Sequence, residues 1–206
     1  MNKETLLRQI AECGYNVGFG AKKHFATYDM ISKIPGIINF LSIAFGVLSL
    51  SFIDLSSAKF LAALVLIMGV VGVYLSCYES EKGKYDELGV KLTNIFNDLK
   101  SLYFVVRDTE SLDIEKSFQE FKNLESSYYK NTLTKQVLLS DWYAHYKFFW
   151  QHQIDWVDEQ LKFNFWRDKV PLSFVITILT IAILCVFYFS DYFYESVRYL
   201  WLSISL

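Results

Sequence analysis

Two apolar segments separated by a short polar link decide the fold. They are residues 37–53 (IINFLSIAFGVLSLSFI) and residues 60–77 (FLAALVLIMGVVGVYLSC), joined by residues 54–59 (DLSSAK). Neither apolar segment contains a charged side chain. A helix needs roughly 17–25 apolar residues to cross the hydrocarbon core of a bilayer, and so short a link returns the second helix through the same membrane. The sequence therefore predicts a transmembrane hairpin within residues 37–78.

A third apolar segment, residues 170–190 (VPLSFVITILTIAILCVFYFS), follows later in the chain. Soluble proteins do bury apolar helices, but three such segments favour a membrane protein. The charged stretch between the second and third segments is too long for a loop and long enough for a helical domain. We predict an all-α integral membrane protein. Its expected parts are a cytoplasmic N-terminal helix (1–36), the hairpin (37–78), a cytoplasmic helical domain (79–169), a third transmembrane helix (170–190) and an outer interfacial tail (191–206).

Basic residues near the three segments predict the orientation. The first side carries Lys22, Lys23, Lys33, Lys82, Lys84, Lys91, Lys162, Arg167 and Lys169, and the other side carries Lys59 and Arg198. Cytoplasmic loops carry the excess of Lys and Arg, so we expect the N-terminus and the central domain in the cytoplasm and the C-terminus outside. The tail mixes aromatic and polar residues (DYFYESVRYLWLSISL), as interfacial anchors do.

Charge and motifs argue against several function classes. The formal net charge is -2, which does not favour direct binding of nucleic acid. Gly18, Gly20 and Lys22 resemble the end of a phosphate-binding loop, but the spacing of that motif and its preceding strand are absent. Close helix contact through Gly14, Gly18 and Gly20 is the favoured interpretation. We expect no catalytic residue, no cofactor and no enzyme activity.

A coiled-coil pattern follows the hairpin. Apolar residues alternate at spacings of three and four, and they are Tyr85, Leu88, Leu92, Ile95, Leu99, Leu102 and Val106, called the seam below. We expect the second span to run on into this helix. A similar pattern from Leu6 to Ile31 ends at Pro35 and Gly36, and it predicts an antiparallel partner helix on the other side of the hairpin.

A second apolar stripe lies before the third span. Trp142, Phe149, Trp156 and Phe163 recur every seven residues, which predicts one helix that runs from about residue 133 into the third span. The stripe either fills the centre of the cytoplasmic bundle or is covered by another copy or a partner.

Two histidines border this stripe, and they also lie seven residues apart. Residues at this spacing on a helix are separated by about 10.5 Å, which is too far for His145 and His152 to bind one metal ion directly. Ordinary hydrogen-bonded histidines or a pH-sensitive seam are the preferred interpretations, and no metal site is expected.

Small residues recur within the hairpin. Ser42 and Gly46 lie in the first span, and Gly69, Gly72 and Ser76 lie in the second. Small side chains let helix backbones approach closely in a membrane. They pack the two spans of one hairpin or join copies in a homo-oligomer. The spans contain no acidic or basic residue near the midplane, which disfavours an ion-coupled transporter.

The chain resembles the SLATT domains of bacteria. The resemblance lies in residues 14–29 (GYNVGFGAKKHFATYD), which lead through Pro35 and Gly36 into a short-turned hairpin and a long cytoplasmic helix. It covers about the first 110 residues by motif and the rest by architecture. SLATT domains are two-span membrane effectors found beside CBASS-type nucleotide-signalling systems and retron-type reverse-transcriptase systems. The third span departs from that pattern.

The resemblance implies a membrane effector of an anti-phage, abortive-infection system. Such an effector assembles in the inner membrane on a signal from a sensor and permeabilises or depolarises that membrane. The sensor would be a nucleotidyltransferase, whose product is a cyclic nucleotide, or a reverse-transcriptase complex. In the mechanism that we expect, the cytoplasmic helices sense the signal and the seam and the Trp142 stripe rearrange into contacts between subunits. A non-toxic membrane scaffold or accessory subunit and a constitutive small channel are the alternatives.

Overall fold

The computed structural model describes residues 2–52, 55–110, 113–131 and 133–204. Within these ranges the regular elements are all helices, which confirms the all-α class. Three of the described helices are long and apolar enough to cross a membrane. The chain divides into two units, Met1–Lys162 and Phe163–Leu206, which are described separately below.

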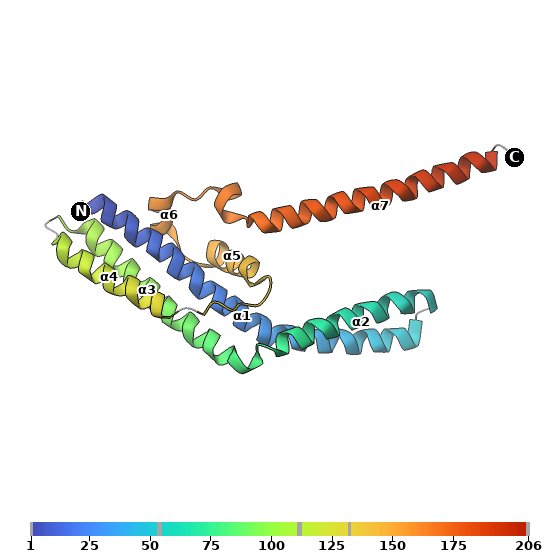
Figure 1. The fold of residues 1–206 in the computed structure, drawn as a ribbon, viewed down its shortest axis with the longest axis horizontal. Helices are drawn as coiled ribbons and strands as arrows, with labels where there is room; N and C mark the ends of the chain where they lie inside the picture. The colour runs from blue at the N-terminus through green and yellow to red at the C-terminus, as the bar shows by residue number, and fades with distance from the viewer. Residues whose placement is uncertain (1, 53–54, 111–112, 132, 205–206) are drawn as a thin grey trace. The chain divides into compact units, whose positions relative to one another are not determined.

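Helix α1 (Lys3–Phe52) continues from a bundle of helices, called the bundle below, into the first candidate membrane span. Its first half buries apolar residues such as Leu6 and Val17, whereas Phe40 in its second half is 70% exposed. The expected end of this helix at Pro35 and Gly36 was wrong, because Pro35 lies inside α1. Proline removes one backbone donor and kinks a helix without having to end it, and α1 changes direction along its length in Figure 1.

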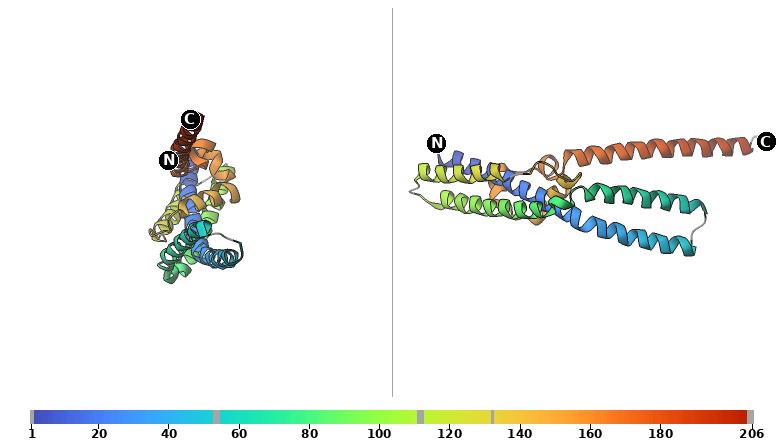
Figure 2. Two further views of the ribbon diagram at one scale, coloured as in Figure 1. Left: turned by 90° about the vertical axis from the view of Figure 1, so that its right-hand side faces the viewer. Right: turned by 60° about the horizontal axis from the view of Figure 1, so that its bottom comes forward.

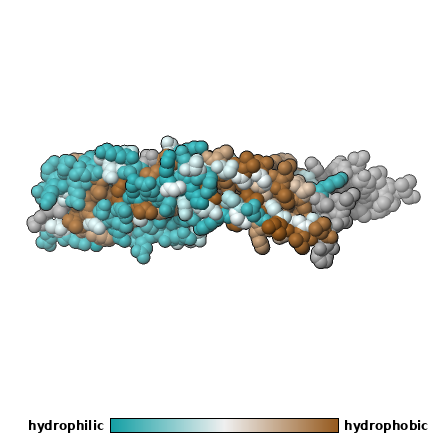
Figure 3. All heavy atoms as spheres, turned by 90° about the horizontal axis from the view of Figure 1, so that it is seen from below, coloured by the Kyte–Doolittle hydropathy of each residue, from teal (hydrophilic) through white to brown (hydrophobic). Residues whose placement is uncertain are grey.

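Helix α2 (Leu55–Ser76) lies beside the second half of α1 and completes the hairpin (Figure 2). Apolar residues gather over the hairpin, whereas hydrophilic residues gather over the helices of the bundle (Figure 3). This division of the surface is expected when the hairpin lies in a bilayer and the other helices lie in water.

A turn separates α2 from α3 (Lys82–Asp108), so the expected continuation of the second span as one helix was wrong. The Tyr78 N–H donates to the Leu75 carbonyl at 3.0 Å, and the Glu81 N–H donates to the Tyr78 carbonyl at 3.1 Å. These bonds close three-residue turns, and residues Glu79–Glu81 form a 3-10 helix. Gly83 follows directly, and glycine has low helix propensity.

The seam of α3 packs within the bundle of the same chain. All of its residues except Leu88 are buried, and Leu88 is half-buried. Helix α1 covers much of this face. Helix α4 (Ile114–Lys130) packs on α3 and α1 through Phe121, and the Asp113 side chain caps its first turn by accepting from the Lys116 N–H at 3.1 Å.

The Trp142 stripe does not form one helix. Helix α5 (Ser140–Gln151) ends before His152, whose backbone is extended (φ −106°, ψ 143°), and helix α6 (Asp155–Leu161) begins after it. Trp142 and Phe149 are half-buried on α5, Trp156 is buried on α6, and Phe163 lies outside both helices. The expected single helix was therefore wrong, because a seven-residue spacing is equally compatible with two helices separated by a break.

Close helix contact at Gly14 and Gly18 is confirmed. A Cβ atom at Gly14 would lie 2.3 Å from Cη2 of Trp156, and one at Gly18 would lie 2.8 Å from Cδ2 of Phe96. At Gly20 the nearest atom would be 3.5 Å away, which is ordinary van der Waals contact. Two of the three glycines thus make room on α1 for large rings from α3 and α6.

The second unit contains a π-helical turn (Phe165–Lys169) and α7 (Leu172–Ile204). Pro171 directly precedes α7, and its carbonyl accepts from the Val175 N–H at 3.2 Å, a position that proline tolerates. The helix continues beyond residue 190, where the sequence predicted that the span would end. Side chains along residues 172–190 are largely exposed and apolar, as a membrane-spanning helix requires.

Candidate functional site

The hairpin and the bundle meet at a region that we call the joint. Residues 133–139, called the strap below, cross this joint between α4 and α5. Five buried side chains from separate parts of the first unit form its core, and they are Ile31, Leu75, Tyr78, Tyr85 and Val137. The strap therefore connects the level at which α1 enters the membrane with the level at which α2 leaves it.

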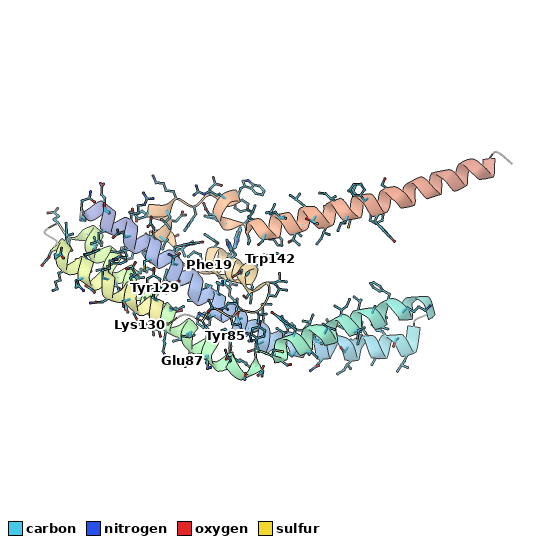
Figure 4. The ribbon with its side chains drawn as sticks, viewed as in Figure 1. Phe19, Tyr85, Glu87, Tyr129, Lys130 and Trp142 are labelled. Atoms are coloured by element: carbon cyan, nitrogen blue, oxygen red, sulfur yellow. The ribbon has the colours of Figure 1, made fainter. Side chains whose placement is uncertain are left out.

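Three tyrosine hydroxyls bind the strap backbone: Tyr74 of α2, Tyr78 of the turn and Tyr85 of α3. Tyr85 Oη donates to the Lys135 carbonyl at 2.7 Å, and Tyr78 Oη donates to the Gln136 carbonyl at 3.4 Å. Tyr74 Oη accepts from the Leu138 N–H at 3.0 Å. Since Tyr74 and Tyr85 lie on opposite sides of the turn after α2, the strap ties the two helices together; Figure 4 labels Tyr85.

The Tyr78 hydroxyl keeps its proton at neutral pH. It lies 3.2 Å from the Tyr74 hydroxyl, and this hydrogen bond together with burial raises the pKa of Tyr78 to about 12. It is therefore available as a donor to the strap under cellular conditions. The Lys135 ammonium lies 4.5 Å from the centre of the Tyr78 ring and adds a cation–π contact.

A buried histidine on α1, His24, contacts Gln136 of the strap. Gln136 Nε2 lies 3.3 Å from His24 Nδ1. The same amide nitrogen donates to the Leu133 carbonyl at 2.9 Å. The amide oxygen of Gln136, Oε1, accepts from the Thr27 hydroxyl of α1. His24 is 3% exposed. Burial, helped by the charge of Lys23, lowers the pKa of His24 to about 4. The ring is therefore neutral at pH 7 and can accept a hydrogen bond from Gln136.

Acidification is expected to destabilise the bundle through His24. The folded protein holds this ring neutral down to about pH 4, whereas an unfolded chain protonates it near its ordinary pKa of about 6.5. Stability is therefore complete above about pH 6.5 and falls as the pH drops toward 4, by on the order of 1–3 kcal/mol. Thermal melts of the detergent-solubilised protein between pH 7.5 and 5 measure this slope, and His24→Gln should reduce it.

His152 provides the control for this experiment, because burial also lowers its pKa to about 4 and it lies away from the strap. His24→Gln should leave in place the part of the pH dependence of stability that comes from His152. The double variant His24→Gln/His152→Gln should remove the contributions of both histidines. An unchanged slope in the single variant would contradict the role assigned to His24.

An ion pair fixes α5 to α1 next to the joint. Asp29 of α1 binds Lys147 of α5 and also Lys33, whose Nζ lies 2.7 Å from Asp29 Oδ1. The side chains of Lys147 and Asp29 are 16% and 15% exposed. Burial alone raises the pKa of Asp29, but hydrogen bonds from Lys147 and Lys33 outweigh burial and lower it. The carboxylate is thus charged at neutral pH and holds α5 just beyond the strap.

The two candidate histidines of the stripe pack against aromatic rings. The His145 ring centre lies 5.1 Å from that of Phe19, and the His152 ring centre lies 4.7 Å from that of Phe96; Figure 4 labels Phe19. Among the residues that the structure describes, no three His, Cys, Asp or Glu side chains gather in a way that would hold a metal ion.

A polar cleft of about 230 Å³ lies between α1 and α4. Glu12 and Glu125 bring carboxylates to it and Lys122 brings an ammonium group. Burial and the nearby charge of Glu125 raise the pKa of Cys13, which also lines the cleft, to about 12. A thiol that stays protonated is a poor nucleophile, so this cysteine is not activated for covalent chemistry.

Of the predicted packing residues of the membrane segments, Gly46, Gly69 and Ser76 are exposed and Gly72 is half-buried in the described hairpin. No described atom lies within 4 Å of a Cβ built at Gly46, Gly69 or Gly72. Ser42 is half-buried, whereas Ser76 is exposed and its hydroxyl donates to the Val73 carbonyl. The three glycines therefore do not bring the backbones of α1 and α2 into close contact.

The sequence analysis assigned no role to the strap. Hydrophobic periodicity does not detect it, because its bonds join residues fifty or more positions apart. One signal was available: Tyr74, Tyr78 and Tyr85 cluster at the end of the second span, where aromatic residues mark the membrane interface.

Residues 1–178 match a known family, described as SMODS and SLOG-associating 2TM effector domain 6. The match covers the whole first unit and the beginning of α7. No curated protein and no solved structure matches the chain.

Proposed function

The chain belongs to the family of SMODS and SLOG-associating 2TM effector domain 6, and from this premise we propose that it is the membrane effector of a bacterial anti-phage defence system. In this proposal it oligomerises on a signal from a sensor and permeabilises or depolarises the inner membrane, which stops growth of the infected cell. The family match over residues 1–178 is the observation that carries the proposal.

The surfaces of the membrane segments support assembly. Apolar side chains of the hairpin such as Phe40, Leu66 and Val73 are each 70% exposed, so lipid or another copy must cover them. The open space at Gly46, Gly69 and Gly72 would let a second helix approach closely. We therefore place the contacts between subunits in the membrane, because the seam of α3 is already buried by helices of its own protomer.

The joint supplies a route by which a signal reaches the hairpin. A change in the cytoplasmic helices would move the strap, and the tyrosine hydroxyls would pass this movement to α2 and α3 on either side of the turn. The signal itself is proposed from the family setting alone, as the product of a nucleotidyltransferase or the state of a reverse-transcriptase complex. The N-terminus and the bundle would face the cytoplasm, as the basic residues beside the spans indicate.

Expression of the chain with its activated sensor is expected to depolarise the bacterial membrane and arrest growth. A voltage-sensitive dye and a growth curve measure both effects in the same culture. Gly69→Leu and Gly72→Leu should abolish depolarisation, because a large side chain blocks close helix approach and the Cβ position at each glycine is open in the described hairpin.

Val70→Leu is the matched control, since Val70 lies on the same helix, is 63% exposed and already carries a branched side chain. It should depolarise the membrane as the parent does. A steady potential and normal growth with the parent chain under activation would favour a scaffold or accessory subunit. Depolarisation that is independent of the sensor and present at low expression would favour a constitutive channel.

A further inference from the structure

The strap ends in two adjacent leucines, and both point away from the core. Leu138 is 70% exposed and Leu139 is 48% exposed, whereas the preceding Val137 is 3% exposed. Leu139 also has a left-handed backbone, with φ at 67°. That conformation is uncommon for a residue other than glycine, asparagine or aspartate. If this turn faced water, two leucine side chains would expose apolar surface on a strained backbone, which is unfavourable.

Their position brings them to the edge of the membrane. The Leu138 N–H donates to Tyr74 Oη, and Tyr74 belongs to the last turn of α2, an apolar helix that is long enough to cross a bilayer. Strap and hairpin belong to the same unit, so this placement follows from the described contacts. The backbone that carries the two leucines is thus bonded directly to the last turn of a helix that can span a membrane.

Several backbone polar groups at this turn are paired within the protein, which lowers the cost of bringing the turn into contact with lipid. The carbonyls of Lys135 and Gln136 accept from tyrosine hydroxyls. The Val137 carbonyl accepts from the Ser140 N–H at 3.1 Å, and the Leu139 carbonyl accepts from the Trp142 N–H at 3.1 Å.

The neighbouring charges fit an anionic lipid surface. Residues 133–140 contain no acidic side chain and one basic one, Lys135, which is exposed beside Tyr78. Asp141 follows, but its carboxylate lies 2.7 Å from Lys23 Nζ and is neutralised there. Tyrosine and lysine at a membrane boundary are typical partners of lipid headgroups.

We propose that Leu138 and Leu139 form a lipid-binding tip that inserts into the inner leaflet beside α2. The tip anchors the strap, and through the strap the cytoplasmic bundle, to the membrane at a point separate from the three spans. The ligand is the boundary between headgroups and acyl chains of a bilayer. The proposal depends on the membrane topology and is independent of any defence function.

Site-directed fluorescence in vesicles tests the tip. The full chain carries Cys77→Ala and Cys185→Ala, which remove its two exposed thiols, while Cys13 stays in place because it is buried. Leu138→Cys then accepts a bimane label, and the protein is reconstituted in vesicles of phosphatidylethanolamine and phosphatidylglycerol. Lipids with a nitroxide near the headgroup should quench this label several-fold more than a label at Val105→Cys. Val105 is the matched control because it is 54% exposed near the end of α3 that is remote from the hairpin. Iodide in the buffer should show the reverse order.

A second variant separates lipid contact from folding. Asparagine tolerates the left-handed backbone at residue 139, so Leu139→Asn keeps the turn and removes half of the apolar tip. It should reduce lipid quenching of the label at 138 and leave the thermal midpoint in detergent unchanged. Equal iodide quenching at 138 and 105 would overturn the proposal. Protection of the label at 138 from both iodide and lipid would also overturn it, because another protein surface would then cover the tip.

Discussion

Gly14→Ala is expected to destabilise the cytoplasmic bundle by about 1–3 kcal/mol, the usual cost of an overpacked core. The added Cβ would lie 2.3 Å from Cη2 of Trp156. This ring has little room to retreat, because it is 3% exposed and the ring centres of Phe96 and Tyr103 lie 5.3 and 5.2 Å from its own. The intrinsic preference of helices for alanine, up to about 1 kcal/mol, offsets part of the cost.

Gly20→Ala is the matched control on the same helix. A Cβ there would lie 3.5 Å from Cδ1 of Leu92, an ordinary contact, so the helix preference should act alone and hold or slightly raise stability. Thermal melts of both variants in the same detergent measure the difference. Equal melting temperatures for Gly14→Ala and Gly20→Ala would mean that the Trp156 ring moves freely and that the packing at Gly14 is not tight.

These glycines show what a sequence can reveal about packing. Glycines at positions 14 and 18 in a run with helical periodicity predict close approach of another element, and the structure has such contacts. The identity of the approaching group could not be predicted. Trp156 reaches Gly14 only because the chain breaks between α5 and α6, and periodicity carries no information on a break that leaves the spacing intact.

The membrane segments were the most predictable part of the fold, because length and apolarity are properties of a local sequence. The joint was the least predictable. Proline at position 35 suggested a helix end, but α1 continues through it, and the seam pattern suggested a continuous helix where a turn occurs. In both places tertiary contacts decide the backbone: the core of Ile31, Tyr78 and Tyr85 forms only when three helices and the strap are in position.

The seam residues illustrate the same limit for function. A coiled-coil pattern predicts an apolar stripe that needs a partner, but it does not say whether that partner is another copy or the same chain. In the structure the partner is the same chain, since α1 packs along α3 and a Cβ built at Gly20 of α1 would lie 3.5 Å from Cδ1 of Leu92. A charged substitution in the seam is therefore expected to disrupt folding of the chain itself.

Leu92→Asp is expected to unfold the cytoplasmic bundle. The side chain is fully buried, so its loss alone costs about 2–5 kcal/mol, and a carboxylate without a partner in this core adds several more. The sum is comparable to the 5–15 kcal/mol that typically stabilise a domain. Val90→Asp, two residues away at a position that is 48% exposed, should change stability by less than about 1 kcal/mol. Limited proteolysis of both variants in native membranes measures the difference.

This contrast decides how a loss of toxicity must be interpreted. A charge at Leu92 removes the fold that carries the joint, so a silent Leu92→Asp variant says nothing about contacts between subunits. Gly69→Leu leaves every buried contact of the bundle in place, because Gly69 lies on open membrane surface. If Leu92→Asp resists proteolysis as the parent does and is still inactive, the seam has a role beyond folding and the assembly contacts extend into the cytoplasm. If it is degraded while Gly69→Leu is intact and inactive, assembly takes place in the membrane.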